Sequence, residues 1–413
     1  MIQYTRHILD NGLTVICHTD TGTPFICVNT LYRVGSRNES EERTGFAHLF
    51  EHLMFSGSKN VNDFDYEIQV AGGENNAYTT FDYTNFYITI PAENIETALW
   101  LESDRMLQLN FSQSALDVQK NVVIEEFKQR YLNAPYGDTW LKLRPLAYQQ
   151  HPYKWPVIGK TPEHIERATL DDVKDFFHRF YTPDRAIICI SGNIAAPKAL
   201  ELVQKWFGDI PPSDGTRETI PMEPIQKEAR ELVVPDNNVP ADVIYKVYHM
   251  GARMSDHFYT CDLISDILSN GQSSRLYQNL IKKSELFSSI DAYVTGDLDP
   301  GLFVFSGKIS PGYSTQEAEQ AILHEIECFI NDPISEREFE KVINKTEARI
   351  KYNEINYQAK AANLAFFEFL GDVSLINNEE EQYRKISINE LKNTAKALFV
   401  PENCSTLFYL KKK

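Results

Sequence analysis

The sequence predicts an α+β protein made of two homologous α/β-sandwich domains, each a mostly antiparallel sheet with helices packed on one face. Three observations support this prediction. At 413 residues the chain is too long for one compact core. Short β-branched and aromatic runs occur with long amphipathic stretches in each half, which fits sheets covered by helices. The order of these segments in the second half repeats that of the first.

In the first half, alternating apolar residues predict strands, and periodic apolar residues over longer stretches predict helices. The expected strands are 6–18, 25–34, a pair within 74–80 and 85–91, and 186–191. The expected helices are 44–55, 62–71 (capped by Asn62 or Asp63), 93–109, 114–130, 170–180 and 195–207. Residues 133–168 are rich in Pro, Tyr and Trp, so we expect an irregular segment there.

The second half matches the first segment by segment. Residues 387–410 match 169–190, 303–330 match 86–109, and 335–350 match 114–129. We therefore predict an N-terminal domain at 1–212, a polar linker at 213–227 that contains proline, and a C-terminal homologous domain at 228–413.

Composition and charge exclude several classes of protein. No apolar run approaches the roughly 20 residues that span a bilayer, so no membrane segment is expected. The start lacks a signal-peptide pattern, which favours a cytoplasmic protein, or a periplasmic one if the start is processed. A net charge of −17 argues against a nucleic-acid partner. The six cysteines are scattered and predict free buried thiols, with a Cys17–Cys27 disulfide as the alternative.

One stretch carries recognisable chemistry, the apolar helix expected at 44–55. His48 and His52 lie one turn apart on it, and Glu51 lies within the same arc of about 100°. Two imidazoles at this spacing can bind one zinc ion, and a carboxylate beside them can act as general base on a water molecule at the metal. This is the H-x-x-E-H pattern, absent from the second half, where the corresponding helix carries Asp262 and Asp266.

A zinc ion with two histidines and one open position needs a third protein ligand, commonly a carboxylate. The helix at 114–130 carries the adjacent acids Glu125 and Glu126, and its Val122, Val123 and Phe127 are expected to face the core. The spacing by itself leaves both acids open as the ligand. In the repeat, Glu347 falls opposite Glu126.

The whole chain resembles the H-x-x-E-H zinc peptidases, or inverzincins, a family that includes pitrilysin, insulin-degrading enzyme and mitochondrial processing peptidase. The matching stretches are 45–57, 73–86, 122–126, 151–153 with 158–159, 181–193 and 273–277. The resemblance implies a zinc metalloendopeptidase with one Zn²⁺ per chain, bound by His48, His52 and Glu126, with Glu51 as base. Glu125 is then an orienting acid, and Gln119 stands where many members carry a second glutamate.

The same resemblance implies that residues Asn75, Asn76, Ala77 and Tyr78 form an edge strand that docks a peptide substrate through backbone hydrogen bonds. Active members also use an Arg and a Tyr seven residues apart, whose places here hold Ile281 and Ser288. We therefore expect a homologous partner subunit that carries this pair but no zinc motif, or a homodimer. Tyr293 is an alternative local donor. The competing functions are a non-catalytic structural subunit and a zinc-binding assembly protein.

Overall fold

The computed structural model describes residues 1–215 and 218–412, which form two compact units. The first unit contains Met1–Gln129, Trp155–Pro221 and Lys351–Asn378, and the second contains Arg130–Lys154, Met222–Ile350 and Glu379–Lys413. Each unit therefore includes chain from both sequence repeats. The domain boundaries predicted at 212 and 228 stay a prediction for those repeats. The predicted linker includes residues 216 and 217, which lie outside the described part of the chain.

The first unit is built on a six-stranded sheet with the order β1-β2-β6-β3-β5-β4. All neighbouring strands are antiparallel except β2 and β6. The strands are β1 (Thr5–Ile8), β2 (Thr14–Thr19), β3 (Phe25–Tyr32), β4 (Glu74–Thr79), β5 (Thr84–Pro91) and β6 (Ala186–Gly192). Strand β4 is paired on one side only and forms an edge of this sheet.

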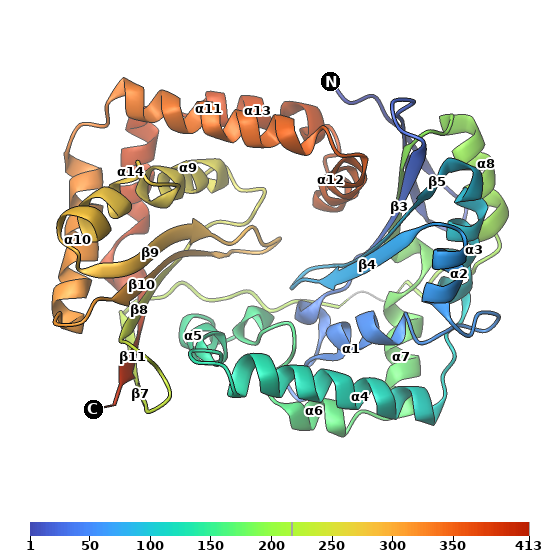
Figure 1. The fold of residues 1–413 in the computed structure, drawn as a ribbon, viewed down its shortest axis with the longest axis horizontal. Coiled ribbons are helices and arrows are strands. Elements are labelled where there is room, and N and C mark those ends of the chain that lie inside the picture. The colour runs from blue at the N-terminus through green and yellow to red at the C-terminus, as the bar shows by residue number, and fades with distance from the viewer. Residues whose placement is uncertain (216–217, 413) are drawn as a thin grey trace. The chain divides into compact units, whose positions relative to one another are not determined.

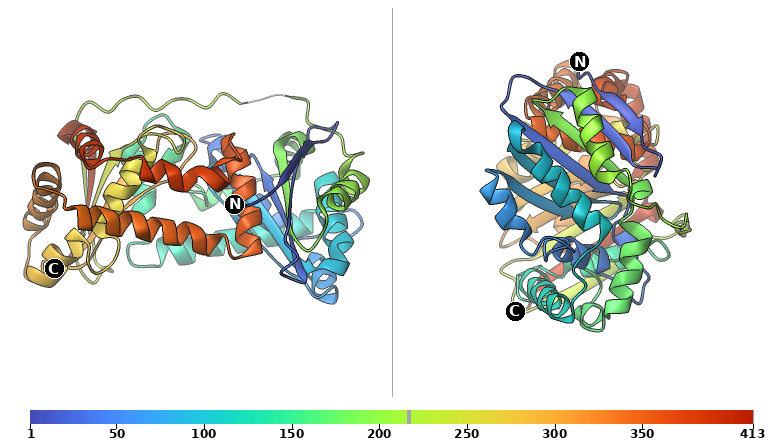
Figure 2. Two further views of the ribbon diagram at one scale, coloured as in Figure 1. Left: turned by 90° about the horizontal axis from the view of Figure 1, so that it is seen from above. Right: turned by 90° about the vertical axis from the view of Figure 1, so that its right-hand side faces the viewer.

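Helices cover both faces of the first sheet. On one face lie α3 (Ile95–Leu107) and α8 (Ala196–Phe207), and α12 (Tyr357–Leu370) packs on β3 and β6 from the opposite face (Figure 1; Figure 2, right, shows α3 and α8 crossing the strands). Two ion pairs hold α12: Arg6 with Glu368 at 2.8 Å and Lys360 with Asp20 at 2.7 Å. The second sequence repeat thus completes the core of the first unit. The other helices of this unit are α1 (Phe46–Leu53), α2 (Phe64–Val70), α4 (Gln113–Phe127), α6 (Pro162–Glu166) and α7 (Leu170–Phe180).

The sheet of the second unit has the order β7-β11-β8-β10-β9. Its strands are β7 (Arg230–Asp236), β8 (Val243–His249), β9 (Phe287–Val294), β10 (Leu302–Ile309) and β11 (Cys404–Lys411). The parallel pair β7 and β11 corresponds to β2 and β6, and the remaining strands correspond in order and direction to β3, β5 and β4. The two sheets therefore confirm the predicted α+β fold with two homologous units.

Helices of the second unit include one that the sequence analysis did not assign. Residues 139–147, predicted as irregular, form α5 (Thr139–Ala147), so that prediction was wrong there and at α6. The proline at position 145 and the mixed aromatic composition concealed the helical period of α5, which packs on β7, β8 and β11. The other helices are α9 (Phe258–Ser269), α10 (Thr315–Asn331) and α14 (Ile388–Leu398); α11 (Glu336–Asn353) and α13 (Leu375–Arg384) cross a boundary between units.

Two further expectations concern single residues and chain segments. All six cysteines are free thiols and five are buried, so the alternative Cys17–Cys27 disulfide is not formed. Among the described residues, no helix combines the length and the apolar character that a bilayer crossing requires.

Candidate active site

Helix α1 is anchored by apolar residues on most of its surface. Phe46, Ala47, Leu49, Phe50 and Leu53 are buried, which leaves His48, Glu51 and His52 on the remaining face. Gly45 precedes α1 as its N-cap residue. Its φ of +89° suits glycine, and an added Cβ would lie 2.6 Å from the Ile158 carbonyl oxygen.

The start of α1 is capped from a distance by Glu39. Its carboxylate accepts the backbone N–H groups of Gly45 and Ala47, both at 2.8 Å, in place of a side chain at the cap position itself. Burial raises the pKa of Glu39 to about 8, although these N–H groups lower it. The sequence analysis did not identify Glu39, because the cap lies seven residues before the helix rather than next to it.

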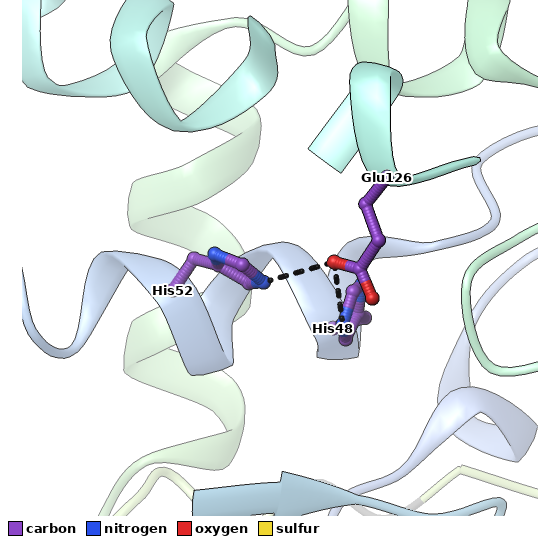
Figure 3. Close-up of side chains that lie close together, drawn as sticks. All are labelled: His48, His52 and Glu126. Carbon is purple, nitrogen blue, oxygen red and sulfur yellow. Dashed lines mark ion pairs between the residues drawn. The ribbon is translucent and has the colours of Figure 1, made fainter. Parts of the chain in front are cut away.

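The ligand atoms of three residues converge between α1 and α4 (Figure 3). Glu126 Oε2 lies 3.7 Å from His48 Nε2 and 3.5 Å from His52 Nε2, and all three ligand atoms lie within 4.8 Å of one another. Ligands about 2.0–2.1 Å from a tetrahedral zinc are separated by about 3.3–3.4 Å. The three residues thus fit a zinc ion after small side-chain movements, with one coordination position left for water or substrate.

The two acids on α4 point in different directions. Glu125 is exposed and its carboxylate lies 2.6 Å from Lys128 Nζ, whereas Glu126 faces the histidines. This arrangement supports Glu126 over Glu125 as third ligand. Gln119 is half-buried two turns before Glu126 and on the same side of α4. Val122, predicted to face the core, is instead 45% exposed, because Val123 and Phe127 occupy the buried positions one turn apart.

The candidate base Glu51 is held by the last residue of β4. The Thr79 hydroxyl donates to Glu51 Oε2 at 2.6 Å. Burial raises the pKa of Glu51, while the Thr79 hydroxyl and nearby His52 lower it. Thr79 directly follows the four residues that the sequence analysis assigned to substrate docking. Its side-chain contact with Glu51 was not predicted, since no spacing rule links a strand residue to a helix residue 28 positions earlier.

The predicted docking segment occupies the edge strand β4. Asn76, Tyr78 and Glu74 are exposed, whereas the alternate residues are half-buried. The Asn75 amide donates to Asp65 on α2, and the backbone N–H of Ala77 bonds to the Asn76 side-chain oxygen at 2.8 Å rather than to β5. This N–H therefore faces away from β5, as expected for a donor that an added strand could use.

In the second unit, the places that the family gives to Arg and Tyr hold apolar and small residues. Ile281 is half-buried against the hydrophobic core of that unit, and the Ser288 hydroxyl donates to the Lys308 carbonyl at 3.2 Å. Tyr293 on β9 is 39% exposed, and burial of its hydroxyl raises its pKa to about 12, so it remains a hydrogen-bond donor at neutral pH.

Comparisons with known proteins match this architecture. A family model described as "Insulinase (Peptidase family M16)" matches residues 14–158, and one described as "Peptidase M16 inactive domain" matches residues 167–346. Zinc protease PqqE of Helicobacter pylori is 29% identical over 405 residues, which is 97% of this chain and 91% of that protein. The crystal structure of a protease from Helicobacter pylori has a TM-score of 0.93 at 28% identity and covers 99% of this chain and 100% of that chain.

A shorter match is the mitochondrial-processing peptidase subunit beta of Saccharomyces cerevisiae, 29% identical over 209 residues, 50% of this chain and 45% of that protein. The class that these matches define is that of zinc metalloproteases. The chain belongs to peptidase family M16, and both parts of the M16 architecture are present. The part matched by the "inactive domain" description is the one without an H-x-x-E-H motif.

Proposed function

We propose that this chain is a zinc metallopeptidase subunit that hydrolyses peptides, or unfolded protein segments, held as an added strand along β4. The observation that carries this proposal is the convergence of the His48, His52 and Glu126 ligand atoms beside a helix that also presents Glu51. Two imidazoles and one carboxylate are a known ligand set for catalytic zinc.

A zinc ion bound there would supply a Lewis acid that polarises the scissile carbonyl and makes water more acidic. Glu51 is the group placed to take the proton of the attacking water and to deliver it to the leaving amine. Anchoring of α1 by its buried apolar residues keeps Glu51 and the histidines in a fixed relation.

The edge strand β4 supports the mode of substrate binding. An extended peptide that pairs with its outer edge would replace the Asn76 side chain as partner of the Ala77 N–H. Backbone pairing of this kind gives affinity with little dependence on sequence, and it leaves Tyr78 and Asn76 exposed for side-chain contacts. The proposed substrates are therefore peptides or protein segments that can adopt an extended conformation.

A homologous partner subunit completes the proposal. Ile281 and Ser288 cannot donate hydrogen bonds to a tetrahedral intermediate as Arg and Tyr would, and loss of one such donor costs about 10²–10³ in rate. The yeast relative is itself named as a subunit. We therefore assign the missing Arg and Tyr to a similar chain without H-x-x-E-H; a homodimer would bring only Ile281 and Ser288 again.

The test combines zinc analysis with cleavage of a quenched peptide by this chain, alone and titrated with the partner. We expect one zinc per chain, hydrolysis that rises with partner, and loss of hydrolysis by about 10²–10⁴ in Glu51→Gln with zinc retained. Activity of Glu51→Gln within tenfold of the parent would remove Glu51 from its role. If the chain alone is as fast as the mixture, the partner requirement is wrong and Tyr293 becomes the candidate donor.

A second candidate function is a non-catalytic structural or assembly subunit of the same family. It is favoured by the "inactive domain" match and by Ile281 and Ser288 in place of Arg and Tyr. Zinc binding without hydrolysis, even with the partner present, would support this second function and exclude the first.

A further inference from the structure

We propose that Thr79 is the positioning residue that orients the base Glu51. Strand β4 would then both pair with the substrate and orient the base. This inference rests on the proposed function. It starts from the hydrogen bond of 2.6 Å between the Thr79 hydroxyl and Glu51 Oε2, a contact between the end of β4 and the middle of α1.

The alternation of β4 explains why Thr79 can reach Glu51. In an antiparallel pair, residues at every second position direct their N–H groups away from the partner strand. Ala77 is such a residue, since its N–H bonds to Asn76 and not to β5, and Thr79 is the next one. The Thr79 side chain lies on the half-buried face of β4, and from there its hydroxyl reaches Glu51. The side chains of Asn75, Ala77 and Thr79 share the half-buried face of the strand.

A short hydrogen bond from Thr79 restricts both the position and the rotation of the Glu51 carboxylate. A glutamate has three side-chain torsions, and loss of one charge-assisted hydrogen bond releases it to other rotamers. Thr79 also lies close to the docking edge, because Ala77, whose N–H faces away from β5, lies two residues before it on β4. The strand that would pair with a bound peptide therefore also carries the residue that orients the base.

The decisive variant is Thr79→Val, which keeps the β-branched shape and the backbone N–H but removes the hydroxyl. We expect kcat to fall about ten- to hundredfold, the range for one hydrogen bond to a charged group, with KM and zinc content unchanged. Thr79→Ser restores the hydroxyl and should return kcat to within about threefold of the parent. Thr89→Val, the same change on neighbouring β5, is the matched control and should leave kcat unchanged.

A double-mutant cycle measures the interaction between Thr79 and Glu51 through thermal stability, and it requires neither zinc nor enzyme activity. In metal-free protein, Thr79→Val should lower Tm in the parent but have little effect in the Glu51→Ala background. Equal Tm shifts in both backgrounds, or a Thr79→Ser variant as slow as Thr79→Val, would overturn the positioning role. A change of KM or zinc content in Thr79→Val would also overturn it, since the role would then be structural.

Failure of the proposed function gives a different result. If the parent binds zinc but hydrolyses no peptide with the partner present, the peptidase proposal fails, whereas the cycle still reports whether Thr79 orients Glu51. A kcat for Thr79→Val equal to that of the parent, in a protein that does hydrolyse peptides, refutes only the role of Thr79.

Discussion

The same pair of helices occurs in both units but presents different chemistry. In the first unit, α1 and α4 bring two histidines four residues apart toward Glu126. In the second unit the corresponding helices are α9 and α11, where Asp262 and Asp266 have the same spacing and Glu347 takes the place of Glu126. The backbone architecture is thus shared, and only the side chains separate a candidate metal site from its counterpart.

The carboxylates of the second unit are matched by protein donors. Asp262 accepts from the Tyr383 hydroxyl at 2.6 Å and lies 3.3 Å from Arg349, and Glu347 pairs with Arg384 at 2.7 Å. Asp266 accepts from Asn270 and Thr346, and burial raises its pKa. Arg349 and Arg384 pair with Asp262 and Glu347, so this corner of the second unit is a network of ion pairs and hydrogen bonds. Helix geometry supplies the same spacing in both units, and we expect the neighbouring charges to determine whether a metal ion binds.

The largest expected effect is that of Glu126→Gln in the first unit. Loss of outer-shell partners already weakens metal binding by about 10–100-fold, so loss of a direct ligand should weaken zinc binding at least about a hundredfold. The matched control is Glu125→Gln, which removes the exposed acid paired with Lys128 and should keep zinc. The metal content of each variant after dialysis measures both effects on zinc binding. The reverse result would move the ligand assignment to Glu125.

Zinc should also stabilise the first unit in a way that depends on Glu126. A ligand at 100 times its Kd stabilises the folded state by about 2.7 kcal/mol, which corresponds to several degrees of Tm for a unit of this size. Thermal unfolding with zinc and with a chelator should differ for the parent and not for Glu126→Gln. An equal shift in both proteins would mean that zinc binds elsewhere.

In the second unit, Asp262→Asn should lower the free energy of unfolding without changing zinc content. The substitution takes away the charge that pairs with Arg349 and one acceptor oxygen near Tyr383, an expected loss of about 1–3 kcal/mol in the free energy of unfolding. Denaturant unfolding measures this loss, and zinc content should stay that of the parent. A fall in zinc content would contradict the prediction that Asp262 has no role in zinc binding.

The smallest expected effect on metal content comes from the double variant Asp262→His with Asp266→His. It recreates the histidine spacing of α1 opposite Glu347, yet Arg384 and Arg349 remain. We expect no additional zinc per chain in metal analysis, although the protein should be less stable. A second zinc equivalent would show that spacing alone is sufficient.

Much of the fold followed from local sequence patterns. The helix predicted at 170–180 is α7 with the same bounds, because a capping box at Thr169 and four buried apolar residues define it. The repeat predicted two similar sheets, and the H-x-x-E-H spacing placed His48, Glu51 and His52 on one face of α1.

The remaining features depend on contacts between distant segments. The cap from Glu39 and the hydrogen bond from Thr79 join residues whose proximity only the folded chain creates. The sequence analysis did not assign α12, and the side on which it packs could not be predicted, since its buried alanine, leucine and phenylalanine side chains would suit either sheet. Val122 shows the same limit on a small scale, as adjacent valines on α4 gave no indication of which one faces the core.

The packing of α12 on β3 and β6 has a consequence for synthesis of the protein on the ribosome. The last strand of the first sheet ends at Gly192, but the helix that covers the β3 and β6 face ends at Leu370. The 178 residues between them (370 − 192) take roughly 10–40 s to translate at about 5–20 residues per second. During that time the nascent chain exposes a sheet face that the folded protein buries, so its first unit reaches its final form only after α12 has been translated.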